Sequence, residues 1–120
     1  MRDHKKLRAF ELADEAVLLI YKITAKFPDE ERYNLTSQMR RAAISVPSNI
    51  VEGCARGSQT EYLRFLEISF SSLRELHYQF DLSQRLGYFH GQDINACKSL
   101  LTETEKVLGA LLRSLRQRTV

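Results

Sequence analysis

Residues 38–57 read QMRRAAISVPSNIVEGCARG, and this stretch decides the fold. At about 100° per residue, polar side chains fall on one face of a helix and apolar side chains on the opposite face. The polar face holds Gln38, Arg41, Ser45, Ser48, Asn49, Glu52 and Arg56, and the apolar face holds Leu35, Met39, Ala43, Val46, Ile50 and Cys54. The pattern predicts one helix that continues through Pro47 and is kinked there, because proline removes a backbone hydrogen bond and crowds the carbonyl four residues before it.

Periodicity and capping signals predict three further helices around this one. Apolar residues recur at spacings of three and four over residues 10–27, 62–80 and 94–115. Ser58 and Glu61 match a capping box, in which the Ser58 hydroxyl accepts from the backbone of Glu61 and the Glu61 carboxylate reaches back. The predicted helices cover about 7–27, 35–56, 59–86 and 92–117. Short connections make them an all-α, antiparallel up-down-up-down four-helix bundle, in a single domain over residues 1–120.

Length and hydropathy bound the class of protein. A chain of 120 residues can bury one hydrophobic core and has no room for a second. No run reaches the 18 or so apolar residues of a membrane span, and acids interrupt the N-terminus where a signal peptide has its apolar core. We therefore expect a soluble, cytoplasmic protein without membrane contact. Cys54 and Cys97 lie on apolar helix faces at no metal-ligand spacing, so we expect reduced core thiols.

Motifs for catalysis are missing from the sequence. Di-iron bundles use Glu-x-x-His pairs, and none of His4, His77 and His90 has a glutamate three residues before it. The chain has no glycine-rich phosphate loop and no Gly-x-Ser-x-Gly motif. His77 and Asp81 lie one turn apart and could form an acid–base pair, although a surface hydrogen bond is the commoner outcome. We expect a protein that is not an enzyme and uses neither metal nor cofactor.

The first two helices carry more apolar surface than one bundle core should need. On the second helix the apolar arc extends about 100° to either side of Ala43, whereas a surface helix needs a stripe of about 100° in total. We expect part of this surface to meet another subunit in a homo-oligomer. The alternative is that the second helix lies deeper in its own bundle.

The polar face of the second helix allows two interpretations. Arg41, Asn49, Glu52 and Arg56 lie at helical spacings and could form a structural polar network of hydrogen bonds and ion pairs. Arginine also suits phosphate oxygens, and Arg40 lies on the flank of the apolar arc. For Asn49 and Glu52 we prefer the structural interpretation, because a carboxylate would repel a phosphate.

The distribution of charge allows two interpretations, one of which is a nucleic-acid partner. The chain carries a net charge of +3, and basic side chains gather in residues 1–8 and 113–118. In an up-down-up-down bundle these two segments share one end, which would give an oligomeric ring a positive rim. The alternative is that basic termini aid solubility and complement a helix C-terminus. The candidate RNA-binding residues are Lys5, Lys6, Arg8, Arg40, Arg41, Arg113, Arg116 and Arg118.

Aromatic residues follow the third predicted helix. Tyr88, Phe89 and His90 come directly after Gly87, which can end that helix in the left-handed conformation. Their rings could stack on bases. Aromatic residues beside a helix-ending glycine more often hold the loop against the core, and we prefer that interpretation.

Six segments stand out in order along the chain: FP at 27–28, LTSQMRRAAISVPSNIVEG at 35–53, RGSQTE at 56–61, RFLEIS at 64–69, LRELHYQF at 73–80 and LGY at 86–88. Together they resemble the family of four-helix-bundle proteins encoded in intervening sequences of bacterial 23S rRNA genes. The resemblance implies an all-α bundle, a homo-oligomeric ring such as a pentamer, and a role in RNA binding. The family is similar to accessory proteins of diversity-generating retroelements, which assist a reverse transcriptase.

Two functions of different class follow. The first is an oligomer that holds rRNA, or an RNA together with a protein partner such as an RNA-processing enzyme, by phosphate contacts. The second is an oligomeric scaffold for protein–protein interaction that does not bind nucleic acid. Salt dependence separates them, because phosphate contacts weaken steeply as salt rises.

Overall fold

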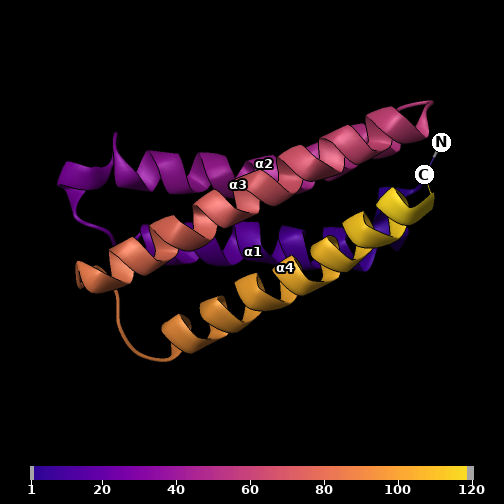
Figure 1. Ribbon diagram of the computed structural model, residues 1–120. Coiled ribbons are helices and arrows are strands. Elements are labelled where there is room, and N and C mark those ends of the chain that lie inside the picture. Colours follow the sequence, from indigo (N-terminus) through magenta and orange to yellow (C-terminus); the bar gives the residue numbers. More distant parts are fainter. Residues whose placement is uncertain (1, 119–120) are drawn as a thin grey trace.

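The computed structural model describes residues 2–118, and every regular element in that range is helical. Four long helices follow one another with short connections (Figure 1): α1 (Arg8–Thr24), α2 (Leu35–Cys54), α3 (Gln59–Arg85) and α4 (Gln92–Arg118). The 3-10 turns η1 (His4–Lys6) and η2 (Asp29–Glu31) precede α1 and α2. α1 ends three residues earlier than predicted, because the amides of Lys26 and Phe27 bond to carbonyls three residues back and tighten the chain into a turn.

The helices run in alternating directions and form a bundle with principal extents of 46 × 25 × 22 Å. Each helix packs against two neighbours, because α1 contacts α2 and α4, and α3 contacts α2 and α4. The pairing of α2 with α3 is the most extensive. The predicted all-α, up-down-up-down four-helix bundle is confirmed, and both chain ends lie at the same end of it (Figure 1).

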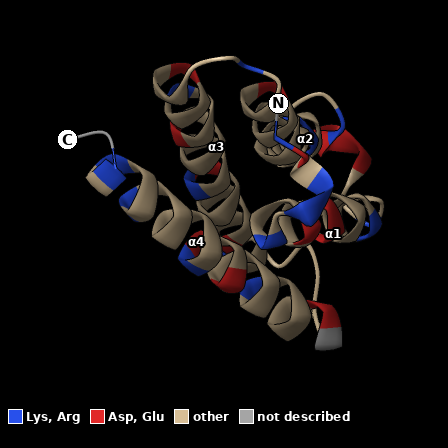
Figure 2. Cartoon of the chain, turned by 90° about the vertical axis from the view of Figure 1, so that its right-hand side faces the viewer, with Lys and Arg blue, Asp and Glu red and all other residues tan. Residues whose placement is uncertain are grey.

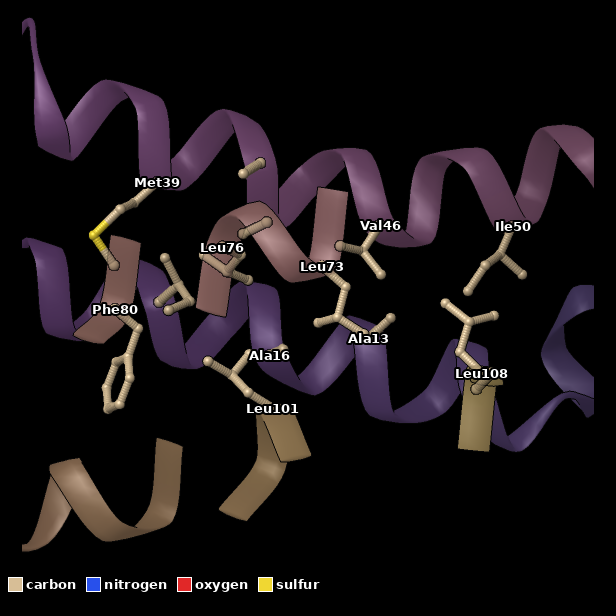
Figure 3. Close-up of a cluster of buried hydrophobic side chains, with 14 of the residues drawn as sticks. Ala13, Ala16, Met39, Val46, Ile50, Leu73, Leu76, Phe80, Leu101 and Leu108 are labelled. Carbon is tan, nitrogen blue, oxygen red and sulfur yellow. The ribbon is translucent and has the colours of Figure 1, made fainter. Parts of the chain in front are cut away.

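The core runs along the bundle axis and is built from the apolar stripes of all four helices. On α1 two neighbouring lines of apolar residues face inward, because Leu12, Ala16 and Ile23 on one line are buried like Ala13 and Ile20 on the other. Ten side chains in Figure 3 point into the shared interior, namely Ala13, Ala16, Met39, Val46, Ile50, Leu73, Leu76, Phe80, Leu101 and Leu108. Helix-period stripes on four segments thus produce one continuous core.

α2 continues through Pro47 as a single helix, as the two stripes predict. Side chains supply extra hydrogen bonds around the proline. The Asn49 amide donates to the Ser45 carbonyl at 2.8 Å, and the buried hydroxyl of Ser69 on α3 donates to the Val46 carbonyl at 2.7 Å. The kink at Pro47 stays a prediction.

The wide apolar arc of α2 is used mainly inside its own chain. Leu35, Met39 and Ile50 are buried, and Pro47 is buried as well. The exposed large apolar side chains on this helix are Ile44 and Val51. The width of the arc therefore reflects the depth of α2 in the bundle, which was the alternative to a subunit interface. Self-association stays a prediction, and the exposed apolar surface that supports it is smaller than the sequence indicates.

The turn between α2 and α3 brings these two helices close together. Gly53 lies against α3 so closely that a Cβ atom built on it would stand 2.9 Å from the Cβ of Phe65. Ser58 caps α3, because its hydroxyl accepts from the amide of Glu61 at 3.1 Å. The Glu61 carboxylate binds Arg64 at 2.9 Å, and no bond from it back to the Ser58 amide is formed in the described residues. The capping box is therefore present in one direction only.

Candidate functional site

Most of the basic candidates gather at the end of the bundle that holds both termini. Lys5 and Lys6 lie in η1 and Arg8 begins α1, while Arg116 and Arg118 lie in the last turn of α4. Figure 2 looks onto this end and shows blue segments at the start of the chain and at the end of α4. The two blue segments lie on different sides of the end, so they frame it rather than form a single patch.

Acidic side chains at this end are largely matched by arginines. Arg8 pairs with Glu11 at 3.6 Å, and Arg116 pairs with Glu67 at 2.9 Å. Arg56 pairs with Glu52 and Arg64 with Glu61 in the same way.

Four other cations at this end behave differently. Lys5, Lys6, Arg113 and Arg118 are exposed, and none of them forms an ion pair within residues 2–118. Because the nearby acids are largely matched, these four side chains give the end a net positive surface.

Arg2 fixes the N-terminal segment to the α2–α3 turn. Its guanidinium donates to the side chain of Gln59 at 2.7 Å and lies over the ring of Tyr62, with Cζ 3.9 Å from the ring centroid. Its amide donates to the carbonyl of Cys54 at 3.1 Å. This clamp holds η1 and its lysines against the bundle. Sequence reasoning counted Arg2 only as a charge, since nothing in the sequence indicates its partners.

Arg40 and Arg41 do not belong to the terminal surface. They lie in the half of α2 that is far from the termini, near the connection from α1 (Figure 1). Arg40 donates from Nε to the Thr24 hydroxyl at 2.8 Å and lies over the Tyr21 ring, with Cζ 4.5 Å from its centroid. It joins α2 to α1 and is not free for a ligand. The eight basic candidates therefore lie at two locations, six at the end that holds the termini and two on α2.

A groove of about 610 Å³ lies at this second location, between the end of α1, the connection and the start of α2. Its wall carries three arginines, Arg32, Arg40 and Arg41, against one acid, Asp29. Tyr33 also lines it and is 89% exposed. Sequence reasoning placed Arg40 on the flank of the apolar arc and Arg41 on the polar face, and it missed Arg32 and Tyr33. The signal was weak, because both lie in the connection between α1 and α2, directly after three acids.

The predicted polar network on α2 divides into separate parts. Glu52 and Arg56 form an exposed i,i+4 ion pair at 3.0 Å. Asn49 bonds to the carbonyl and hydroxyl of Ser45, whose hydroxyl bonds to that of Ser72 on α3 at 2.8 Å. Arg41 is exposed and bonds to none of these residues, so the four-residue network is wrong with respect to Arg41. The part of α2 around Arg41 faces solvent, and Arg41 itself lines the groove.

The aromatic residues after α3 hold the loop to the core. Phe89 is buried and lies between Phe27 and Phe80, with ring centroids 6.0 and 5.3 Å away. The Tyr88 hydroxyl donates to the Glu31 carboxylate at 2.6 Å. That bond is the main cause that lowers the pKa of Glu31 and raises the pKa of Tyr88. These rings are engaged with the protein itself, in line with the preferred interpretation.

His77 and the two cysteines have structural surroundings. His77 bonds through Nδ1 to the Glu105 carboxylate on α4 at 2.9 Å, a contact that joins α3 to α4. Both cysteines are buried free thiols, and burial raises the pKa of Cys97 to about 12.

Within residues 2–118, no group of three or more His, Cys, Asp or Glu side chains is placed to hold a metal ion. No helix in that range is long and apolar enough to cross a membrane.

The geometry defines a class first: a small all-α protein made of an up-down four-helix bundle. The chain belongs to the 23S rRNA-intervening sequence protein family, whose model matches residues 5–110. The resemblance read from residues 27–88 is therefore confirmed.

A crystal structure supports the same fold. It is that of a protein of unknown function from the S23 ribosomal protein family of Bacteroides thetaiotaomicron, and it superimposes with a TM-score of 0.79 at 20% sequence identity. The match covers 87% of this chain and 97% of that one. No protein with a curated description matches the chain. At this identity the likeness concerns the fold.

Proposed function

We propose that this protein binds RNA through phosphate contacts at the end of the bundle that holds the termini, as a homo-oligomer and without catalysing a reaction. One observation carries the proposal: Lys5, Lys6, Arg113 and Arg118 are exposed at one end and form no ion pair within residues 2–118. Cations of this kind are available to phosphate oxygens, whereas those already paired would first have to break an ion pair.

The chemistry of such a surface is contact with the backbone of a nucleic acid and not with its bases. Lysine offers a point charge and arginine a planar set of donors, and both suit phosphate. Each phosphate contact releases condensed counterions, so log affinity falls linearly with log salt, with a slope of about −0.7 per contact on single strands. Four such cations per subunit therefore predict a steep dependence on salt.

Self-association would multiply this surface. Two exposed apolar residues on α1, Leu18 and Tyr21, lie three positions apart on one face, and Ile44 and Val51 share a face of α2. The Tyr21 ring touches Arg40, one turn before Ile44, so the two faces adjoin. Leu18 and Val51 lie outside the lining of the groove, and this part of the surface supports an interface with another copy of the chain. A ring of five would carry a charge of five times +3, or +15.

The test is light scattering in line with size-exclusion chromatography, with and without RNA, at low and moderate salt. The double variant Lys5→Glu/Lys6→Glu and the double variant Arg113→Glu/Arg118→Glu should each retain less RNA and release it at lower salt, and both should keep the assembly mass. The control is Lys98→Glu/Lys106→Glu, which makes the same charge change at exposed positions along α4. We expect the control to retain RNA.

The scaffold function makes the opposite prediction. An assembly that retains no RNA even at low salt would refute RNA binding and leave protein–protein interaction, which the exposed Leu18 and Val51 favour. A stable particle near 13.9 kDa would refute self-association. Loss of RNA in the control and the test variants alike would show that only total charge matters, and the terminal surface would be wrong.

A further inference from the structure

We propose that the groove between the end of α1 and the start of α2 binds an unpaired nucleotide of an RNA strand, with the base on Tyr33 and the phosphate on Arg32 and Arg41. This inference rests on the proposed RNA binding and adds a second, chemically different site to it. The groove lies toward the end of the bundle opposite the termini (Figure 1). A contact there is therefore separate from the contacts of the terminal surface.

The charge of the groove favours an anion. Among its lining residues, Arg32, Arg40 and Arg41 stand against Asp29, which leaves an excess of two positive charges. Arg40 is held by Thr24 and Tyr21, and it contributes charge without being free to move. Arg32 and Arg41 are exposed and form no ion pair within residues 2–118. Two guanidinium groups on one wall can hold a phosphate by several hydrogen bonds.

The aromatic residue distinguishes a nucleotide from an acidic peptide. The Tyr33 side chain is 89% exposed, although a tyrosine usually buries much of its ring. Nothing in the core requires the ring at that position, in contrast to Tyr88, whose hydroxyl is bonded to Glu31. A nucleic-acid base can stack on such a ring beside a phosphate-binding arginine, which is the usual pattern in single-strand recognition. A carboxylate peptide would use the arginines and leave the ring idle.

Size and access favour one or two nucleotides from a single strand. The volume of about 610 Å³ falls within the range of about 300–1,000 Å³ that small-ligand sites occupy. A base must leave its stack before it can lie on Tyr33, so a continuous duplex would not fit the groove. The occupant is therefore an unpaired segment, such as a strand end or a loop.

The experiment measures the affinity of a fluorescent tetranucleotide by anisotropy at fixed low salt. Tyr33→Ala should weaken binding about tenfold, as loss of one base–aromatic stack does, and Arg41→Gln should weaken it several-fold. The matched controls are Tyr78→Ala and Arg85→Gln, which remove an exposed tyrosine and an exposed arginine on α3. We expect both controls to bind as the unaltered protein does. Circular dichroism of Tyr33→Ala should be unchanged, because its side chain is exposed.

A second arm tests stacking directly. A tetranucleotide that lacks its bases should bind the unaltered protein about as weakly as the normal one binds Tyr33→Ala. Equal affinity for both oligonucleotides would overturn the role of Tyr33. Equal affinity of the groove variants and their controls would overturn the whole inference, as would tight binding of free AMP with none of the tetranucleotide, because that result would make the occupant a free nucleotide.

Failure of this inference can be told apart from failure of the proposed function. A long RNA retained through Lys5, Lys6, Arg113 and Arg118, without any effect of Tyr33→Ala on the tetranucleotide, would overturn the groove alone. A protein that retains no long RNA at low salt would overturn the proposed function, whatever the tetranucleotide does. Tetranucleotide affinity that drops in Tyr33→Ala and is unchanged in Lys5→Glu/Lys6→Glu would support the groove as a separate site.

Discussion

Replacing Gly53 by alanine should destabilise the bundle, although the same change in a helix usually stabilises it. Gly53 lies one residue before the end of α2 and faces α3. A Cβ atom there would stand 2.9 Å from the Cβ of Phe65 and 3.3 Å from the backbone carbonyl of Tyr62. Neither atom is the far end of a flexible side chain, so one helix must shift relative to the other.

The size of the effect follows from two opposing terms. Overpacking a close contact costs about 1–3 kcal/mol. Alanine in place of glycine gains at most about 1 kcal/mol in a helix interior, and less at Gly53 because the helix ends at the next residue. We therefore expect Gly53→Ala to lower the free energy of unfolding by about 1–2 kcal/mol, since packing outweighs propensity here.

Gly109 provides the matched control. It is a buried glycine in the interior of α4, and a Cβ atom there would meet Arg113 at 3.5 Å and Phe70 at 3.6 Å, which are ordinary contact distances. Gly109→Ala should therefore raise the free energy of unfolding by about 0.5–1 kcal/mol. Urea unfolding followed by helical circular dichroism, at one protein concentration, gives both values. Equal or greater stability of Gly53→Ala would refute the close approach of α2 and α3.

Three further predictions concern single side chains. Hydrogen bonding to Tyr88 lowers the pKa of Glu31, so this bond stabilises the fold above pH 4.5. Its contribution is lost as the pH falls through the lowered pKa of Glu31 in the folded state. In unfolding curves measured in acid, the stability difference between Tyr88→Phe and the unaltered chain should therefore shrink. Burial raises the pKa of Cys97 to about 12, from 9.0 for an exposed thiol. At pH 8, Cys97 should therefore react with iodoacetamide about a thousandfold more slowly in the folded chain than in urea, which mass spectrometry can follow. Ser69→Ala should lower the free energy of unfolding by about 1 kcal/mol, because the Val46 carbonyl loses a buried donor; no loss in urea unfolding would contradict this.

The fold could be predicted because its determinants are local. The spacing of apolar residues over 35–54 predicts which face of α2 is buried, and Met39 and Ile50 lie on that face. Ser58 before a polar turn gives the start of α3 for the same reason. The early end of α1 could not be read in this way, since Phe27 continues the apolar period although the backbone has already turned.

The site was harder to predict because its geometry depends on contacts between distant segments. Arg2 meets Gln59 and Tyr62 across more than 50 residues of chain, and only the fold brings them together. The basic candidates included Arg40 and the terminal residues alike, because a list of residues contains no distances. The exposure of Tyr33 was equally hidden, since a tyrosine in a connector can lie against the core, as Tyr88 does, or face solvent.

The stretch that identifies the fold carries little of the proposed function. Ser45 and Asn49 on the polar face of α2 bond to each other and to Ser72 on α3, so part of that face is a helix–helix contact. The cations to which we assign RNA contacts lie in η1, at the end of α4 and in the lining of the groove. Stability and RNA binding should therefore respond to different substitutions. Gly53→Ala should change the midpoint of urea unfolding and leave the salt slope of RNA binding unchanged. Lys5→Glu/Lys6→Glu should reduce that slope by about 1.4 on single strands and leave the midpoint of urea unfolding unchanged. A charge variant that shifts the midpoint as strongly as Gly53→Ala would show that the terminal cations hold the bundle together, and their availability to phosphate would then be refuted.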